Sequence, residues 1–242
     1  MSTYVFSDVH GHSRALDRAL ERVSPCADDR IFCLGDMVDR GPDPVGVMRI
    51  VRSLPGVVAL MGNHESLMAS CVADPDDALA ALNWGINGGN ATSEALRALP
   101  GDQARELVDW AVGLPRAAAT RVGERTFLLC HAGVRLSVPA QAPEAPLWIR
   151  EEFWGAPHGP AGPDADGERC PVVVCGHTPT PYLERMGARL DEPVLDYAGR
   201  ARMARVGADR WDVDCAAAAG EGVGQVLVLR LDDGAETVLE GE

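Results

Sequence analysis

The stretch Gly35-Asp36-Met37-Val38-Asp39-Arg40-Gly41 decides the fold of this chain, because it follows directly on the short apolar run Ile31–Leu34. That run has the length and the near-continuous hydrophobicity of a strand that is covered on both faces. The glycines beside the charged residues let the backbone approach a ligand closely. The rest of the chain repeats this pattern of a buried strand followed by a polar loop.

Four other apolar runs end in loops that carry histidine, carboxylate or amide side chains. The runs and their loops are Thr3–Phe6 with Asp8-Val9-His10-Gly11, Val57–Met61 with Gly62-Asn63-His64-Glu65, Thr126–Cys130 with His131-Ala132-Gly133, and Val172–Cys175 with Gly176-His177-Thr178. Loops beyond the carboxyl ends of strands converge on one crevice in open α/β sheets. Five such loops therefore predict a site for two metal ions.

Helical signals between the early runs predict a layered α/β fold, which we interpret as a single domain over residues 1–242. Val226–Leu231 is expected to form a sixth strand. Helix starts are expected at Ser13, Asp43-Pro44, Asp74-Pro75 and Gly101-Asp102. Three further segments are expected to be a connection or loops: Leu114–Arg125, Pro139–Pro146 and Gly155–Gly167.

Composition excludes several classes of protein. The formal charge is −14, from 22 basic and 36 acidic residues, which is the wrong sign for broad binding to nucleic acid. All the basic residues are arginine, so a lysine Schiff base and a P-loop lysine are excluded. With no long apolar run, we expect no membrane span, no signal peptide and a cytoplasmic protein. Seven cysteines without a CxxC pair predict reduced, mostly buried thiols.

Each polar residue also has a simple structural reading when it is taken alone. An Asp-x-His can be a surface turn, and a single histidine after a strand can be a hydrogen-bonded core residue. Four of the six histidines, however, directly follow apolar runs and lie within one residue of a glycine. The simple reading is kept for the remaining candidates, with His12 and His158 expected to be exposed, and Asp212 and Asp214 expected to form a turn.

The order and wording of these motifs resemble the calcineurin-like metallophosphoesterases, and within them the bacterial serine/threonine phosphoprotein phosphatases. The resemblance covers residues 3 to about 231. Trp84-Gly85-Ile86-Asn87-Gly88-Gly89 with Thr92, and Trp148-Ile149-Arg150-Glu151, support it. It implies an α/β sandwich of mixed β-sheets flanked by helices.

The same resemblance implies a ligand set for two divalent metal ions. Asp8 and His10 would hold the first ion, Asp36 would bridge both, and the second would be held by Asn63, His131 and His177. Carboxylate, imidazole and amide donors suit borderline ions, so manganese is expected, with iron or zinc as the other options.

The catalytic residues are also implied by the resemblance. His64 would be the general acid, Asp39 would orient it, and Arg40 and Arg150 would hold phosphate oxygens through their planar guanidinium groups. A hydroxide activated by the two metal ions would then hydrolyse phosphomonoesters. The expected substrate is a phosphorylated protein or peptide, with no nucleic-acid or membrane partner.

Two alternatives stay open. A symmetrical bis(5'-nucleosyl)-tetraphosphatase shares the fold and most ligands but typically lacks an aspartate at the place of Asp39, and it tends to have aspartate where this chain has Glu65. Both residues therefore favour the protein phosphatase. Ser7 replaces a glycine that is more usual in the family, which should matter little. A non-catalytic module that binds phosphoproteins is the other alternative, although all six ligands and His64 are present.

Overall fold

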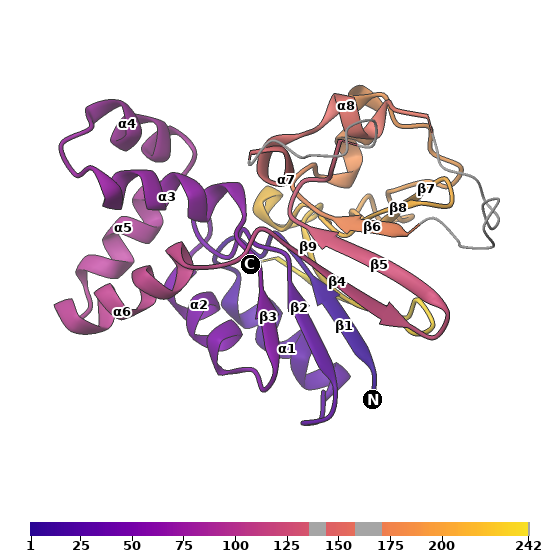
Figure 1. The fold of residues 1–242 in the computed structure, drawn as a ribbon, viewed down its shortest axis with the longest axis horizontal. Helices are drawn as coiled ribbons and strands as arrows, with labels where there is room; N and C mark the ends of the chain where they lie inside the picture. Colours follow the sequence, from indigo (N-terminus) through magenta and orange to yellow (C-terminus); the bar gives the residue numbers. More distant parts are fainter. Residues whose placement is uncertain (136–143, 158–170, 242) are drawn as a thin grey trace.

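The computed structural model describes residues 1–135, 144–157 and 171–241. In these ranges the strands form two five-stranded sheets (Figure 1). Across the first sheet the strands are β10 (Glu236–Glu240), β9 (Gln225–Arg230), β1 (Thr3–Phe6), β2 (Arg30–Cys33) and β3 (Val57–Ala59). β1, β2 and β3 are parallel, whereas β9 is antiparallel to both β1 and β10.

The second sheet is also mixed. Its strands, in order, are β4 (Ala117–Val122), β5 (Arg125–Cys130), β6 (Val172–Cys175), β8 (Arg210–Asp212) and β7 (Ala204–Val206). β5, β6 and β8 are parallel, so their carboxyl ends meet at one edge. β4 and β7 run antiparallel to their neighbours at the two sides.

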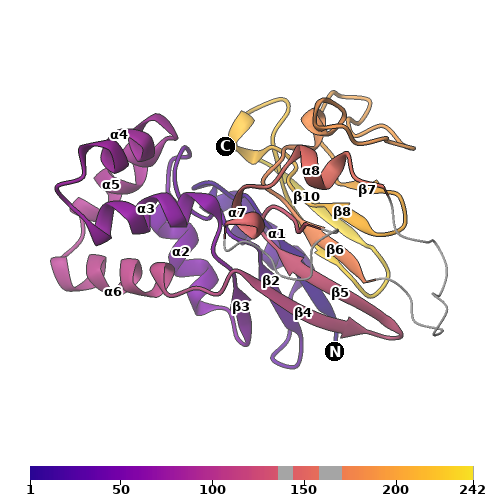
Figure 2. The same ribbon diagram turned by 45° about the horizontal axis from the view of Figure 1, so that its top comes forward.

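Helices cover both outer faces and extend to one side of the sandwich. The helices are α1 (Ser13–Val23), α2 (Pro44–Ser53), α3 (Asn63–Ala73), α4 (Ala78–Ile86), α5 (Gly89–Arg97), α6 (Gly101–Val112), α7 (Ala145–Trp148) and α8 (Glu151–Trp154), with short 3₁₀ turns η1 (Thr180–Met186) and η2 (Ala217–Ala219). In both views α3 to α6 gather at one side of the sheets (Figures 1 and 2). The architecture confirms the fold class that the motifs implied.

Alternation along the strands builds three apolar layers. In β1, Val5 points into the layer between the sheets, and Tyr4 and Phe6 point to the layer under α1 and α2. In β6, Val174 points inward, and Val173 packs toward α8 in the third layer. Both faces of these strands are therefore buried, which explains why their sequences are apolar at nearly every position.

All six predicted strands are present, with boundaries that differ by two residues at most. Two expectations about secondary structure were wrong. The segment 114–125 is not a plain connection but contains β4, and the helix expected at Asp74-Pro75 starts at Ala78, where the Asp77 side chain accepts hydrogen bonds from the first turn. Of the predicted loops, Pro139–Pro146 overlaps α7, and the rest of it and most of Gly155–Gly167 lie outside the described residues.

The remaining expectations had mixed outcomes. His12 was expected to be exposed but is buried at the N-cap position of α1, where its ring lies against Gly241. His158 lies outside the described residues. Among the described cysteines all thiols are free, and Cys33, Cys130, Cys175 and Cys215 are buried. Within these same ranges no helix is both long and apolar enough to cross a membrane.

A buried arginine fixes the segment that leads from α8 to the second sheet. The Arg210 side chain on β8 is fully buried and donates to the backbone carbonyls of Phe153, Ala156 and Pro157 at 2.6, 3.0 and 2.6 Å. Its guanidinium also stacks 5.1 Å from the centre of the Phe153 ring. The α8 segment begins immediately after Arg150, so Arg210 indirectly holds that residue in place.

We predict that Arg210→Met lowers the free energy of unfolding by about 3 kcal/mol, because the buried carbonyl of Phe153 and the partly buried carbonyls of Ala156 and Pro157 lose their donor. Urea denaturation followed by circular dichroism measures this change. Arg200→Met is the matched control, since Arg200 forms exposed ion pairs with Asp196 and Glu240 that contribute little. Equal stability of the two variants would contradict the structural role of Arg210.

Candidate metal centre

The polar loops behind four strands meet at one end of the sandwich. Asp8 follows β1, Asp36 follows β2, His131 follows β5 and His177 follows β6. The backbone links these loops directly, since the Asp8 N–H donates to the Gly35 carbonyl and the Gly176 N–H donates to the His131 carbonyl. The two sheets therefore bring side chains from distant parts of the sequence into one buried cluster.

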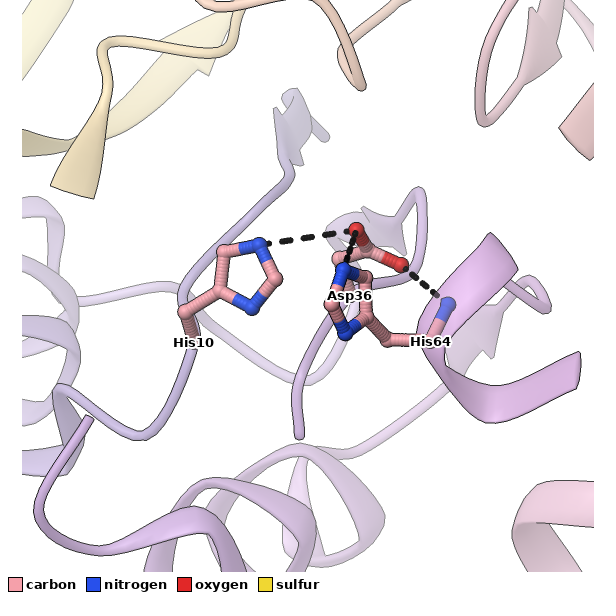
Figure 3. Close-up of side chains that lie close together, drawn as sticks. All are labelled: His10, Asp36 and His64. Carbon is pink, nitrogen blue, oxygen red and sulfur yellow. Dashed lines mark hydrogen bonds and ion pairs between the residues drawn. The ribbon is translucent and has the colours of Figure 1, made fainter. Parts of the chain in front are cut away.

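The first group of possible ligands consists of His10, Asp36 and His64, which point toward one another (Figure 3). Asp36 Oδ2 lies 3.5 Å from His10 Nε2 and 3.8 Å from His64 Nε2. All three side chains are buried. His64 enters this group because α3 begins at Asn63, a helix start that the sequence analysis missed, and the His64 N–H donates to Asp36 Oδ1 at 3.0 Å.

The second group shares Asp36 with the first. Asp36 Oδ1 lies 3.4 Å from His131 Nε2, which lies 3.2 Å from His177 Nδ1. The Asn63 Oδ1 atom is 2.9 Å from each of these two nitrogens. Four donors, from α3 and from the loops that follow β2, β5 and β6, thus converge, and the two oxygens of one carboxylate serve both groups.

Backbone carbonyls fix which nitrogen of two histidines faces the centre. His10 Nδ1 donates to the Val38 carbonyl at 2.8 Å, and His131 Nδ1 donates to the Leu34 carbonyl at 3.0 Å. In each neutral ring this leaves Nε2 as the lone-pair nitrogen, which is the state that binds metal. Burial lowers the pKa of His131, but the charges of Asp36 and Asp8 outweigh it and raise the pKa to about 9. A bound cation would replace this proton.

Asp8 lies beside the second group rather than inside the first. Its Oδ2 accepts a hydrogen bond from the His177 N–H at 3.0 Å, and burial raises its pKa. A side chain at Gly176 would overlap this oxygen, so only glycine fits there. The structure thus brings five of the six expected ligands into the two groups and places Asp8 against one of them.

A hydrogen-bonded pair connects the centre to the helices at its side. His64 Nδ1 lies 2.7 Å from Asp39 Oδ2, and the Asp39 side chain is fully buried. Trp84 Nε1 donates to Asp39 at 3.0 Å, and the Thr92 hydroxyl donates to it at 2.6 Å. Burial lowers the pKa of His64, but the Asp36 charge and the Asp39 hydrogen bond raise it more, so the net shift is upward. The two aspartates thus favour a protonated His64, and the charge of Arg40 opposes them.

The two expected phosphate-binding arginines contact the imidazoles of the centre. Arg40 places its Nη1 and Nη2 atoms 2.8 Å from His10 Nε2 and His64 Nε2, respectively. Arg150 Nε donates to His177 Nε2 at 2.9 Å. Both guanidinium groups therefore stand at the mouth of the site, where a phosphate oxygen would approach.

A buried glutamate that follows His64 holds the Asp36 loop. Glu65 Oε2 accepts from the N–H groups of Asp36 and Gly62, both at 2.8 Å, and Oε1 accepts from those of Met37 at 2.9 Å and Val38 at 3.3 Å. Burial and the Asp36 charge raise the pKa of Glu65 to about 7, while the hydrogen bonds from Asp36 and Gly62 oppose that rise. Four converging donors make Glu65 the anchor of this loop.

The backbone of the centre is strained. A left-handed backbone conformation is uncommon outside glycine and clusters at functional sites, where the surrounding structure enforces it. Six residues of the centre adopt it: Asp8, His10, Asp36, Asp39, Arg40 and His177. Glu65 and the close-packed glycines supply the enforcement here.

Asp212 and Asp214 were expected to form a turn, but Asp212 ends β8 and Asp214 lies in the loop that follows, and both side chains are buried beside the centre. Asp212 Oδ1 accepts from the Asp214 N–H, and Asp214 Oδ1 accepts from the Ala216 N–H. Burial raises the pKa of both, and so does negative charge, with Asp214 acting on Asp212 and Asp8 acting on Asp214. Sequence reasoning missed this position because burial of an aspartate leaves no local signal.

The donor set fits two divalent cations. Asn63 and three histidines supply nitrogen and oxygen donors of the kind that Mn, Fe and Zn accept. Six buried carboxylates surround the centre, and burial raises the pKa of four of them, Asp8, Glu65, Asp212 and Asp214. Bound cations would favour the ionised form of these groups. The carboxylates are Asp8, Asp36, Asp39, Glu65, Asp212 and Asp214.

Comparison with known families agrees with this geometry. Residues 1–219 match the model of the calcineurin-like phosphoesterases. The chain belongs to this family. Members use divalent metals, and the two groups that share Asp36 are where this phosphoesterase would hold them.

Curated relatives add a narrower likeness. This phosphoesterase is 36% identical over 138 residues to a protein of Erwinia tasmaniensis named symmetrical bis(5'-nucleosyl)-tetraphosphatase. The match covers 55% of this chain and 45% of the relative, so it spans about half the length of that protein. The motifs suggested the bacterial serine/threonine phosphatases, but this relative carries the name of a tetraphosphatase.

Solved structures share the fold. A chain described as a candidate diadenosine tetraphosphatase matches with a TM-score of 0.65 at 20% identity, over 99% of this chain and 93% of that one. A cold-active protein-tyrosine phosphatase of Shewanella matches with a TM-score of 0.53 at 17% identity, over 99% and 80%. Proteins with different named substrates thus share this architecture, and the fold alone does not select a substrate.

We predict that Asp36→Asn abolishes metal binding in both groups, because one carboxylate serves them both. The loss should exceed the roughly 10- to 100-fold that is typical when a partner outside the ligand set is removed. Metal content after dialysis, measured by inductively coupled plasma mass spectrometry, reports the result. Asp39→Asn is the matched control. It should keep two ions, because Asp39 contacts His64 Nδ1, the ring nitrogen that does not face Asp36. Two ions in Asp36→Asn would contradict the shared-ligand arrangement.

We also predict that Glu65→Gln lowers the free energy of unfolding by about 2–4 kcal/mol, because the amide has one acceptor oxygen and leaves two buried N–H groups without a partner. Urea denaturation measures the loss. Glu124→Gln, at an exposed position, is the control and should change stability by no more than about 0.5 kcal/mol. If both variants unfold at the same urea concentration, Glu65 does not anchor the loop.

Proposed function

We propose that this phosphoesterase hydrolyses dinucleoside polyphosphates of the diadenosine tetraphosphate type at two divalent metal ions. The observation that carries the proposal is the pair of ligand groups that share Asp36. The name of its curated relatives supports the substrate class. Manganese is the proposed native metal, and the donor set also suits iron or zinc.

Five of the six expected ligands keep the roles that the motifs suggest. Asp36 would serve both ions, with His10 on one side and Asn63, His131 and His177 on the other. Asp8, which the motifs assign to the first ion with His10, accepts the His177 N–H and so stands nearer the second. Ions bound there would polarise a phosphoryl oxygen and lower the pKa of an attacking water. The protein itself fixes the ligands before binding, through carbonyl hydrogen bonds to His10 and His131.

The remaining residues act on the phosphate and on the leaving group. Arg40 and Arg150 would turn from the imidazoles to the phosphate oxygens, which bind planar guanidinium groups more strongly than neutral nitrogen does. His64, which Asp39 orients and keeps protonated, would give its proton to the departing oxygen. In a dinucleoside tetraphosphate that oxygen belongs to a nucleoside diphosphate.

Asp39 and Glu65, which favoured a protein phosphatase at the level of sequence, do not discriminate between substrates by their contacts. Asp39 holds His64, and Glu65 holds the backbone of the Asp36 loop. Both contacts lie behind the reacting groups and serve any phosphoester. The preference that these two residues gave is therefore not carried into the proposal.

A serine/threonine protein phosphatase is the second candidate, because a network of hydrogen bonds holds His64 in place. Three residues, Asp39, Trp84 and Thr92, hold this general acid. A serine or threonine alkoxide is a much poorer leaving group than a diphosphate and needs such an acid more. The phosphorylated protein or peptide that the motifs suggested remains the substrate of this alternative.

We predict a higher kcat/KM for diadenosine tetraphosphate than for a phosphothreonine peptide when the manganese-loaded enzyme is given both. Chromatography should show ADP as the product of a symmetrical cut, and Asp36→Asn is the blank for both reactions. A preference for the peptide would overturn the proposal in favour of the second candidate. Neither activity from protein that holds two ions would favour a non-catalytic phosphate-binding module.

A further inference from the structure

A groove opens beside the metal centre on the side of α7 and α8. Its volume is about 610 Å³, and it is lined by these two short helices and by Met186 of η1. Arg150, which donates to His177 Nε2, also lines it. The groove therefore begins where a bound phosphate would end, and any group attached to that phosphate on this side must enter it.

The most prominent side chain in the groove is an exposed indole. Trp148 is 43% exposed, although a tryptophan usually buries most of its surface. Its ring centre lies 6.0 Å from that of His177, with the planes at 85°, so the indole is perpendicular to the ring of a residue in the second ligand group. A planar group that follows the phosphate would find an open aromatic surface one ring away from the centre.

The two ends of the groove carry opposite charges. Glu144 and Glu151 are exposed at its rim, and a third rim carboxylate, Glu152, pairs with Arg135 at 2.9 Å. These carboxylates accept hydrogen bonds from amino groups, and they disfavour an anionic group at the outer end of the groove. Cationic charge that faces the centre comes from Arg150. A ligand with an anionic end at His177 and a flat, neutral, amino-bearing end at Trp148 matches this arrangement.

We propose that Trp148 is the stacking platform for a purine base of the substrate and that the acidic rim receives the amino group of that base. The inference rests on the proposed function, since it gives the nucleotide end of the substrate a place in the same site. A base stacked on an aromatic side chain typically gains affinity without strong sequence preference. Trp148 would therefore act mainly on KM and less on kcat.

The test compares AMP with ribose 5-phosphate, which differ only by the base. Isothermal titration calorimetry of the manganese-loaded protein gives both dissociation constants, and a phosphate assay on the same samples shows whether either phosphomonoester is hydrolysed. Wild-type protein should bind AMP roughly 5- to 100-fold more tightly than ribose 5-phosphate, which is the range expected for one stacked base. In Trp148→Leu this ratio should fall close to one, and Trp148→Phe should retain most of it.

Tyr197→Leu is the matched control, because Tyr197 is a fully exposed aromatic residue outside the groove. It should leave the ratio unchanged. Equal binding of AMP and ribose 5-phosphate by wild-type protein would overturn the inference, and so would a high ratio that survives Trp148→Leu. If the ratio behaves as expected but diadenosine tetraphosphate is not hydrolysed, the base site stands and the proposed reaction fails.

Discussion

The whole centre depends on the Asp36 carboxylate, whose two oxygens contact different groups of ligands. Asp36 Oδ2 points to His10 and His64, while Oδ1 points to His131 and accepts the His64 N–H. Burial would raise the pKa of Asp36, but the surrounding His131 and His64 lower it well below its usual range, so it stays ionised. A buried carboxylate that stays ionised needs hydrogen-bond donors or cations around it, and the loops beside Asp36 supply them.

The packing around Asp36 follows from that requirement. Four N–H groups close on Glu65, glycines allow the loops to approach, and six residues of the centre take up left-handed backbone. Such strain is sustained only where the rest of the fold is rigid, and the apolar layer between the two sheets supplies that rigidity. The site is therefore built before any ligand arrives.

The strand ends made much of the centre predictable from sequence. Asp36 and His131 each follow a short apolar run within three residues, which is a local pattern. The partners of these residues were not predictable, because they come from distant segments: Trp84 reaches Asp39 from 45 residues away, and Glu65 reaches back 29 residues to Asp36. The burial of Asp212 was not predicted either, because the local sequence around an aspartate is the same whether its side chain is buried or exposed. The substrate was not predictable from sequence either. Asp39 and Glu65, on which that prediction rested, contact His64 and the Asp36 loop and do not line the groove.

The most direct test of the account is anomalous diffraction from crystals of the wild-type protein grown with manganese. The account predicts two anomalous peaks, one on each side of Asp36, with His10 beside the first peak and His131 and His177 beside the second. It also predicts that Arg40 and Arg150 lie away from the imidazole nitrogens of His10, His64 and His177 in these crystals. A single peak, or two peaks that do not share Asp36, would contradict the central claim.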